Sequence, residues 1–282
     1  MYDVGASRQR NHLHTLVKNI MIIPLVTVTF FLFGWWIYWA FPNAFPGIGS
    51  INFAAGAAYT PWSENMGTNI DDRITGVFWA ALILFSWTAA SIVSGSVIER
   101  IRSSALWLHA VMIGSVWWII DAAWGWHWDG WMVKELGYHD AYASGVIHAI
   151  AGGYALGPRI GKFAADGTPR DIPPHNPWLL TIGIFMIYTG FWGFYAACNV
   201  PVISPEAIGG QITGATWAAT NIYLAPTSLS AITFNFLMSL SGGLMAAYIV
   251  FKGDPFWTFS GGLTGIIPPL LAMTCSTLFR PY

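Results

Sequence analysis

The sequence predicts an all-α integral membrane protein, a helical bundle of about seven transmembrane helices in a single domain over residues 1–282. Of the 282 residues, 55% are hydrophobic and 9% are charged, whereas a soluble domain carries about 25% charged residues. The apolar residues gather in windows of the roughly 20 residues that a helix needs to cross a bilayer. The net charge of −1 offers no basic surface for nucleic acid.

Seven such windows follow one another along the chain. They cover residues 17–41, 75–98, 104–124, 142–160, 177–198, 225–251 and 257–276. The connectors FPNAFPGIGS, after the first window, and FKGDP, after the sixth, are rich in the proline and glycine that favour turns. The polar residues 1–16 predict a cytoplasmic segment, and residues 17–276 predict the transmembrane bundle.

Lysine and arginine are distributed unequally between the two sides of this topology. Nine lie on the side of the N-terminal segment, namely Arg8, Arg10, Lys18, Arg100, Arg102, Arg159, Lys162, Arg170 and Lys252. Three lie on the other side, namely Arg73, Lys134 and Arg280. Because cytoplasmic loops collect basic residues, we expect an integral protein of the plasma (inner) membrane with a cytoplasmic N-terminal segment.

Small residues recur within the windows, as in TAASIVSGS (88–96), SLSGGLMAA (239–247) and SGGLTG (260–265). Lipid tails are as apolar as the helices, so small residues that allow close backbone approach mark helix contacts. We interpret these stretches as packing surfaces.

The segment DAYASGVIHAIAGG (140–153) places two titratable residues in an apolar stretch. We expect Asp140 to cap a helix and to shape its mouth, because a carboxylate there accepts backbone N–H bonds and meets the positive end of the helix dipole. His148 then lies about 12 Å deeper, at about 1.5 Å per residue. A titratable residue at such depth indicates a functional site; a structural hydrogen bond to a neighbouring helix is the alternative.

The third connector, WGWHWDGWMVKELGYHD (124–140), lies on the outer side in this topology. Its tryptophans suit an interfacial belt or a cation-collecting vestibule, because an aromatic face attracts cations. Its acids Asp129, Glu135 and Asp140 outnumber Lys134, which also favours a cation. A metal site is less favoured, since His127, Asp129, His139 and Asp140 include no i, i+4 ligand pair, and we expect no metal and no cofactor.

Several motifs, in order, resemble the ammonium transporter (Amt/Rh) family. GASRQRN (5–11) is similar to the family's Gly-x-x-Arg-x-Lys/Arg-Asn stretch, and GSVIERIRSSA (95–105) to its Glu-Arg connector. DAYASGVIHAIAGG resembles its Asp-x-Ala-Gly-Gly-x-Val-His segment, and FWGFYAACNV (191–200) its Gly-Trp-Phe-Gly-Phe-Asn segment. The resemblance implies ammonium or ammonia transport in an eleven-helix fold with inverted repeats, of which this chain lacks most of the first helix and the last three.

The resemblance also implies roles for individual residues. Trp128, Phe85 and Cys198 would form the substrate-binding site that recruits the cation, with Cys198 in place of the family's serine. A thiol is a weaker hydrogen-bond partner than a hydroxyl, so Cys198 is a chemical departure from the family's substrate-binding site. Phe85 and Phe194 would form the gate, and His148 takes the position of the first of two pore histidines.

The implied protein is a transporter and not an enzyme, a homotrimer in the lipid bilayer that a cytoplasmic regulatory protein could bind. The residues up to Tyr282 offer no second pore histidine. We therefore expect a fragment, a pore completed by another polypeptide, or a chain that does not conduct. An ammonium sensor with the same fold is the main alternative, and a membrane metalloenzyme that uses the outer connector is a less favoured one.

Overall fold

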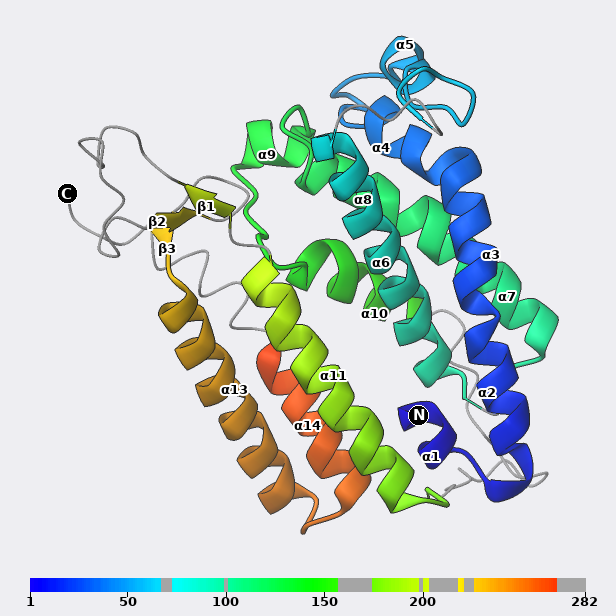
Figure 1. The fold of residues 1–282 in the computed structure, drawn as a ribbon, viewed down its shortest axis with the longest axis vertical. Helices are drawn as coiled ribbons and strands as arrows, with labels where there is room; N and C mark the ends of the chain where they lie inside the picture. The colour runs from blue at the N-terminus through cyan, green and yellow to red at the C-terminus, as the bar shows by residue number, and fades with distance from the viewer. Residues whose placement is uncertain are drawn as a thin grey trace. The chain divides into compact units, whose positions relative to one another are not determined.

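The computed structural model describes residues 1–66, 73–98, 101–156, 174–197, 200–202, 218–220 and 226–267. The chain forms two compact units. The first comprises Met1–Tyr2, His139–Ser144 and Asn176–Tyr282, and the second comprises Asp3–Tyr138 and Gly145–His175. Helices dominate both units, which confirms the predicted all-α class (Figure 1).

Among the described residues of the second unit, three long apolar helical stretches stand out. One is the continuous series η1 (Gln9–Asn11), α2 (His12–Ile20), α3 (Ile22–Thr29), the π-helical η2 (Phe30–Gly34) and α4 (Trp35–Ala40). The others are α6 (Arg73–Ser96) and the series α7 (Ser103–Met112), π-helical η4 (Ile113–Trp117) and α8 (Trp118–Gly125). Shorter helices are α1 (Tyr2–Ala6), α5 (Phe53–Ala57), α9 (Trp131–Leu136) and, after the π-helical η5 (Ser144–Ala149), α10 (Ile150–Leu156).

Close packing in the second unit depends on small residues in η4. A Cβ added at Gly114 would lie 2.8 Å from Val26 Cγ1 and 3.1 Å from the carbonyl oxygen of Ser86. Beside it, the hydroxyls of Thr29 and Ser115 share a hydrogen bond of 2.8 Å. The helices α3 and α6 therefore approach η4 closely because no side chain at Gly114 separates them.

The first unit contains α11 (Pro177–Ala197), α13 (Leu229–Val250) and α14 (Pro255–Ile266). A small antiparallel sheet with the order β1-β2-β3 is formed by β1 (Val200–Val202), β2 (Ala218–Thr220) and β3 (Pro226–Thr227). The sequence did not predict these short strands. The predicted turn at FKGDP is present: Asp254 caps α14 by accepting the Trp257 N–H at 3.0 Å, and Pro255 occupies the first turn, where no N–H is required.

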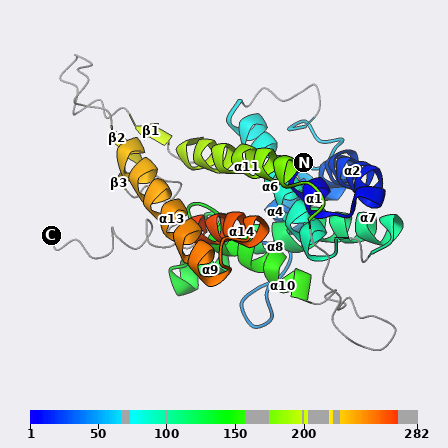
Figure 2. The same ribbon diagram turned by 90° about the horizontal axis from the view of Figure 1, so that it is seen from below.

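Helices α13 and α14 lie side by side in Figures 1 and 2 and pack through glycine. A Cβ at Gly243 would lie 2.4 Å from the Gly261 carbonyl oxygen and 2.8 Å from Gly265 Cα. Helix α11 is tied to α14 by two tyrosines: Tyr188 donates to the Phe259 carbonyl at 2.6 Å, and Tyr195 donates to the Ile266 carbonyl at 2.9 Å. The small-residue stretches 239–247 and 260–265 are therefore packing surfaces, as predicted, and the structure shows that they pack against each other.

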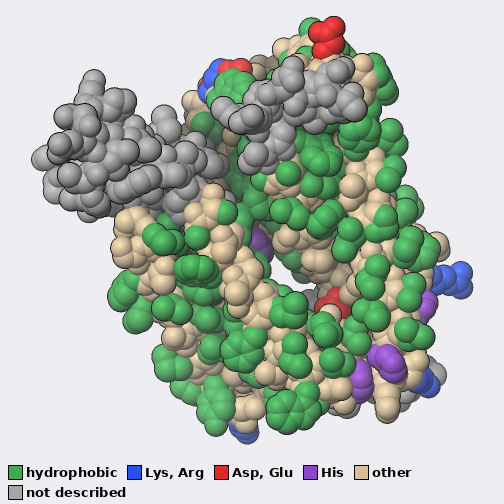
Figure 3. Space-filling model, viewed as in Figure 1, with side chains coloured by type: hydrophobic (Ala, Val, Ile, Leu, Met, Phe, Trp, Pro, Cys, Tyr) green, Lys and Arg blue, Asp and Glu red, His purple; other side chains and the backbone are tan. Residues whose placement is uncertain are grey.

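Five helices in the described part of the chain are long and apolar enough to cross a membrane: Gln9–Ala40, Phe78–Ser96, Ser103–Gly125, Pro177–Ala197 and Leu229–Val250. They agree with five of the seven predicted windows. The other two windows, 142–160 and 257–276, contain α10 and α14 and then pass outside the described residues. Apolar side chains cover much of the visible helix surface (Figure 3), as on α13, where Phe234 and Ile249 are 64% and 75% exposed.

Candidate functional site

The turn between α8 and α9 carries Trp128, the residue that the sequence assigns to a vestibule. The backbone N–H of Trp131, just after the turn, donates to the Pro42 carbonyl at 3.0 Å. This bond holds the turn against the end of α4. The Trp128 side chain is 63% exposed, so its ring remains accessible from the surface.

The ring of Trp128 is supported by two other rings. It packs on the imidazole of His127 with ring centroids 4.2 Å apart and a tilt of 32°. It also meets Trp39 edge-on at 5.3 Å. Trp39 in turn stacks on Tyr59 at 4.0 Å. The orientation of Trp128 is therefore determined by packing with the aromatic residues at the end of α4 and in the loop that follows.

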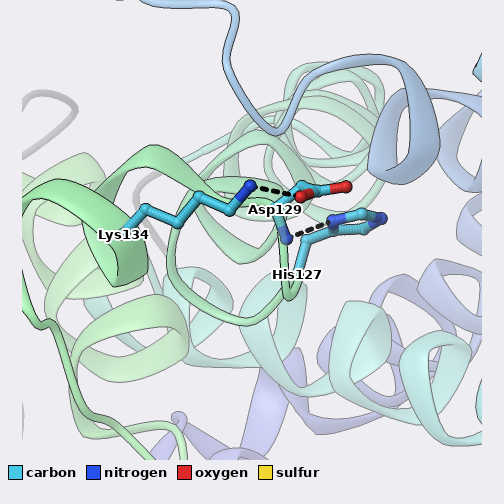
Figure 4. Close-up of polar contacts among 3 residues, drawn as sticks. All are labelled: His127, Asp129 and Lys134. Carbon is cyan, nitrogen blue, oxygen red and sulfur yellow. Dashed lines mark hydrogen bonds and ion pairs between the residues drawn. The ribbon is translucent and has the colours of Figure 1, made fainter.

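His127 is a buried histidine that sequence reasoning did not single out. Its side chain is 4% exposed, and its Nδ1 accepts the Asp129 N–H at 3.0 Å (Figure 4). Burial lowers the pKa of His127 from 6.5 to about 4, because a buried site disfavours the charged ring. The imidazole is thus neutral at physiological pH, and with Nδ1 as an acceptor its proton lies on Nε2.

Asp129 forms an ion pair with Lys134, whose Nζ donates to the Asp129 carboxylate (Figure 4). This hydrogen bond lowers the pKa of Asp129, so the carboxylate is ionised at neutral pH. Both side chains are about half exposed, at 48% and 50%, and an exposed pair of this kind contributes little to stability. The negative charge of Asp129 is therefore partly neutralised by Lys134. This pairing reduces the excess of negative charge that the connector presents to a cation.

Phe85 on α6 lies among indole rings. Its ring centroid is 5.2 Å from that of Trp126 and 6.3 Å from that of Trp118. Trp118 is held in turn, since its Nε1 donates to the Gly114 carbonyl at 2.7 Å and to Ser86 Oγ at 3.1 Å. The structure thus brings Phe85 next to Trp126, two residues before Trp128, a neighbour that the sequence pattern did not identify.

Asp140 is fully buried and accepts the backbone N–H of Ser144, the first residue of η5 (Ser144–Ala149), at 2.8 Å. Between them, Ala143 has a φ of +71°, in the left-handed region that non-glycine residues rarely adopt. The π-helical segment η5 follows and includes His148, whose side chain is half-buried. Strained residues and π-helical turns both occur preferentially at functional sites.

The remaining predicted residues lie in the first unit. Phe194 is half-buried on α11, with its ring centroid 5.6 Å from that of Tyr195, whereas Phe85 belongs to the second unit. Cys198 lies outside the described residues. Among the described residues, no group of three or more His, Cys, Asp or Glu side chains is placed to hold a metal ion.

The sequence model of the ammonium transporter family matches residues 1–280, nearly the whole chain. The chain belongs to the ammonium transporter family. This membership confirms the resemblance found in the motifs and identifies the apolar helices as those of an integral membrane protein.

Named relatives agree with this assignment. Ammonium transporter Amt2 of Archaeoglobus fulgidus is 33% identical over 284 residues, which cover 95% of this chain and 54% of that protein. Ammonium transporter Amt1 of Methanocaldococcus jannaschii is 25% identical over 273 residues, which cover 94% and 59%. The chain thus spans little more than half the length of these relatives.

A solved structure described as a Sensor Amt Protein shares the fold. It superposes with a TM-score of 0.62 at 23% identity, covering 96% of this chain and 68% of that chain. At this identity the likeness supports the arrangement of the helices in an ammonium transporter fold.

Proposed function

We propose that this chain takes part in moving ammonium across a membrane, the activity for which its transporter relatives are named. One observation from the structure supports the proposal most directly: an exposed Trp128 ring packed on the neutral His127 and adjacent in sequence to the ionised Asp129. A tryptophan face attracts a small cation, and a neutral imidazole behind it does not oppose that attraction.

The proposed cycle begins with recruitment of the ammonium cation by Trp128, Phe85 and Cys198. The substrate then passes the gate formed by Phe85 and Phe194, loses its proton, and moves past His148 as ammonia. Desolvation supports this order, because a dry apolar path penalises an ion far more than a neutral amine. Potassium has no proton to lose and is excluded by the same penalty.

The setting of this activity is part of the proposal. The chain acts as a transporter and not as an enzyme, in the plasma (inner) membrane with its N-terminal segment in the cytoplasm. It assembles as a homotrimer and accepts a cytoplasmic regulatory partner. The uneven distribution of basic residues between the two sides supports the orientation, and family membership supports the assembly.

Uptake of labelled methylammonium tests the proposal in cells that lack their own ammonium transporters and express the complete reading frame. Trp128→Leu should raise the half-saturation concentration about 2- to 30-fold with little change in maximal rate, as expected from losing a cation–π contact of about 0.5–2 kcal/mol. Trp62→Leu is the matched control, because Trp62 is 81% exposed and has no proposed role. Equal loss at low and high substrate would contradict the vestibule role of Trp128.

His148→Ala examines the pore. We expect it to abolish proton-coupled current or selectivity over potassium, because the neutral path loses its polar lining. Unchanged transport would leave His148 with only a structural hydrogen-bonding role. Ammonium binding to the unmodified protein without any uptake would overturn transport in favour of a sensor.

A further inference from the structure

Tyr195 on α11 is a buried tyrosine directly after Phe194, and the proposed transport cycle gives it no role. Its side chain is 1% exposed. In the family's Gly-Trp-Phe-Gly-Phe-Asn segment, which residues 190–195 resemble, asparagine stands at this position. A large, rigid ring thus takes the place of a small amide beside the proposed gate.

Other rings of the first unit hold Tyr195 in place. Its ring centroid lies 5.7 Å from that of Tyr142, 5.5 Å from that of Phe236 and 6.0 Å from that of Phe191. The interplanar angles are 68°, 76° and 75°, and edge-to-face pairs at such distances attract each other. The three partners come from the turn before η5, from α13 and from α11 itself, so the ring is fixed by separate parts of the unit.

Two hydroxyl groups meet the end of α14 next to this ring. Tyr195 donates to the Ile266 carbonyl at 2.9 Å, and the Ser144 hydroxyl donates to the Ile267 carbonyl at 2.8 Å. The last carbonyls of a helix have no partner within the helix, and an apolar environment makes such a partner necessary. The two bonds therefore join α11, α14 and the turn that carries Tyr142 into one frame around Tyr195.

Phe194 packs against this frame. Its ring centroid lies 5.6 Å from that of Tyr195, with an interplanar angle of 51°, and its side chain is half-buried. Side chains in close-packed surroundings are held in one rotamer by their neighbours. A fixed ring at Tyr195 thus limits the positions that the Phe194 ring can take.

We propose that Tyr195 is a positioning residue of the gate: it fixes the ring of Phe194 and so sets the size of amine that passes. This inference rests on the proposed function, because it requires a gate at Phe194. Tyr195 touches no substrate and acts only through Phe194. One methylene in a close-fitting site is worth about 10- to 200-fold in selectivity, so a loosened Phe194 ring favours methylammonium relative to ammonium.

Uptake of labelled methylammonium and of ¹⁵N-ammonium tests this role in cells that lack their own ammonium transporters and express the complete reading frame. Tyr195→Leu should raise the ratio of maximal rates, methylammonium over ammonium, at least about threefold. The half-saturation concentrations should not change, because recruitment lies elsewhere. Tyr195→Phe keeps the ring and should keep the ratio of the unmodified protein.

Tyr188→Leu is the matched control. Tyr188 lies about two turns earlier on α11 and donates to the Phe259 carbonyl of α14 at 2.6 Å, so this variant makes the same change between the same two helices. A purely structural loss lowers uptake of both substrates together. The ratio should therefore stay unchanged in Tyr188→Leu, and a rise equal to that of Tyr195→Leu would overturn the positioning role.

A double variant shows whether Tyr195 acts through Phe194. Phe194→Leu alone should raise the ratio, and adding Tyr195→Leu should raise it no further, because the ring to be positioned is gone. A full further rise would overturn the proposal. An unchanged ratio in Tyr195→Leu beside a raised ratio in Phe194→Leu would also overturn it but leave the gate standing, whereas unchanged ratios in both would overturn the gate as well.

A second measurement does not depend on transport. A fluorinated phenylalanine is placed at position 194, and the purified protein is studied in detergent by ¹⁹F NMR. We expect one narrow resonance in the unmodified background and in Tyr188→Leu, and a broadened or divided resonance in Tyr195→Leu. A spectrum of Tyr195→Leu equal to that of the unmodified background would overturn the positioning role even in a chain that transports ammonium.

Discussion

Acidification from pH 7 toward pH 4 provides a direct test of the burial of His127. Burial lowers the pKa of this ring from 6.5 to about 4. Between these two values the unfolded chain binds a proton that the folded protein does not. The free energy of unfolding therefore rises with pH across this window, and the stability is lost as pH falls through it.

The magnitude follows from the two pKa values. Moving the pKa from 6.5 to about 4 corresponds to about 3 kcal/mol of unfolding free energy once the ring is protonated. That is a large share of the 5–15 kcal/mol typical of a folded domain. Protonation also removes the acceptor for the Asp129 N–H and places a positive charge 4.2 Å from the Trp128 ring centre, which opposes a cation on that ring.

Histidine-selective ¹⁵N NMR in detergent measures this pKa, and the resonance missing from His127→Phe identifies the ring. We expect a midpoint near 4, as well as a smaller fall in unfolding free energy between pH 7 and pH 5 for His127→Phe than for the unmodified protein. Asp129→Asn should lower the His127 pKa further and Lys134→Met should raise it, because these charges act on the ring in opposite directions. A midpoint at or above 6.5 would refute the burial argument.

Three further substitutions test the packing and the strain. Ala143→Gly should raise the unfolding free energy by about 0.5–1 kcal/mol, because relief of the left-handed φ outweighs the added unfolded-state entropy; a lower melting temperature would contradict this. Gly114→Val should lower the free energy of unfolding by about 1–3 kcal/mol through overpacking against α3 and α6. An unchanged melting temperature would show that the helices can move apart without cost. Burial raises the pKa of Asp3 despite hydrogen bonds from Asn19 and Ser94. Asp3→Asn should therefore stabilise the fold at pH 7 and lose that advantage below pH 4, and a benefit independent of pH would argue against a desolvated carboxylate.

The fold was largely predictable because two local signals determine it. Hydropathy over about 20 residues locates a spanning helix regardless of its neighbours, and the five long helices agree with that signal. The glycine-rich stretches 239–247 and 260–265 predicted contact surfaces, and the approach of Gly243 to Gly261 shows that they pack against each other. The π-helical turns η2, η4 and η5 were not predicted, because a single i→i+5 turn within an α-helix is too short to leave a periodic pattern in the sequence.

The sequence pointed to site residues whose chemistry follows from their residue type. It did not point to residues whose chemistry depends on the side chains packed around them. The tryptophans of the connector suggested a cation-binding vestibule because an aromatic face attracts cations, and the family resemblance singled out Trp128 among them. His127, one residue earlier, was read only as a member of a histidine- and aspartate-containing loop. Its importance comes from Tyr38, Trp39 and Trp128, whose rings surround it at centroid distances of 5.3, 5.3 and 4.2 Å.

Burial by these three rings converts a histidine with an ordinary pKa into a neutral support for Trp128. A histidine left in water beside Trp128 would be charged for part of the time below pH 6.5 and would then weaken the attraction of the indole for a cation. The same burial leaves Nε2 of His127 without a hydrogen-bond partner among the described residues. One packing event therefore accounts for the neutral support beneath Trp128, and it cannot be deduced from the order of residues along the chain.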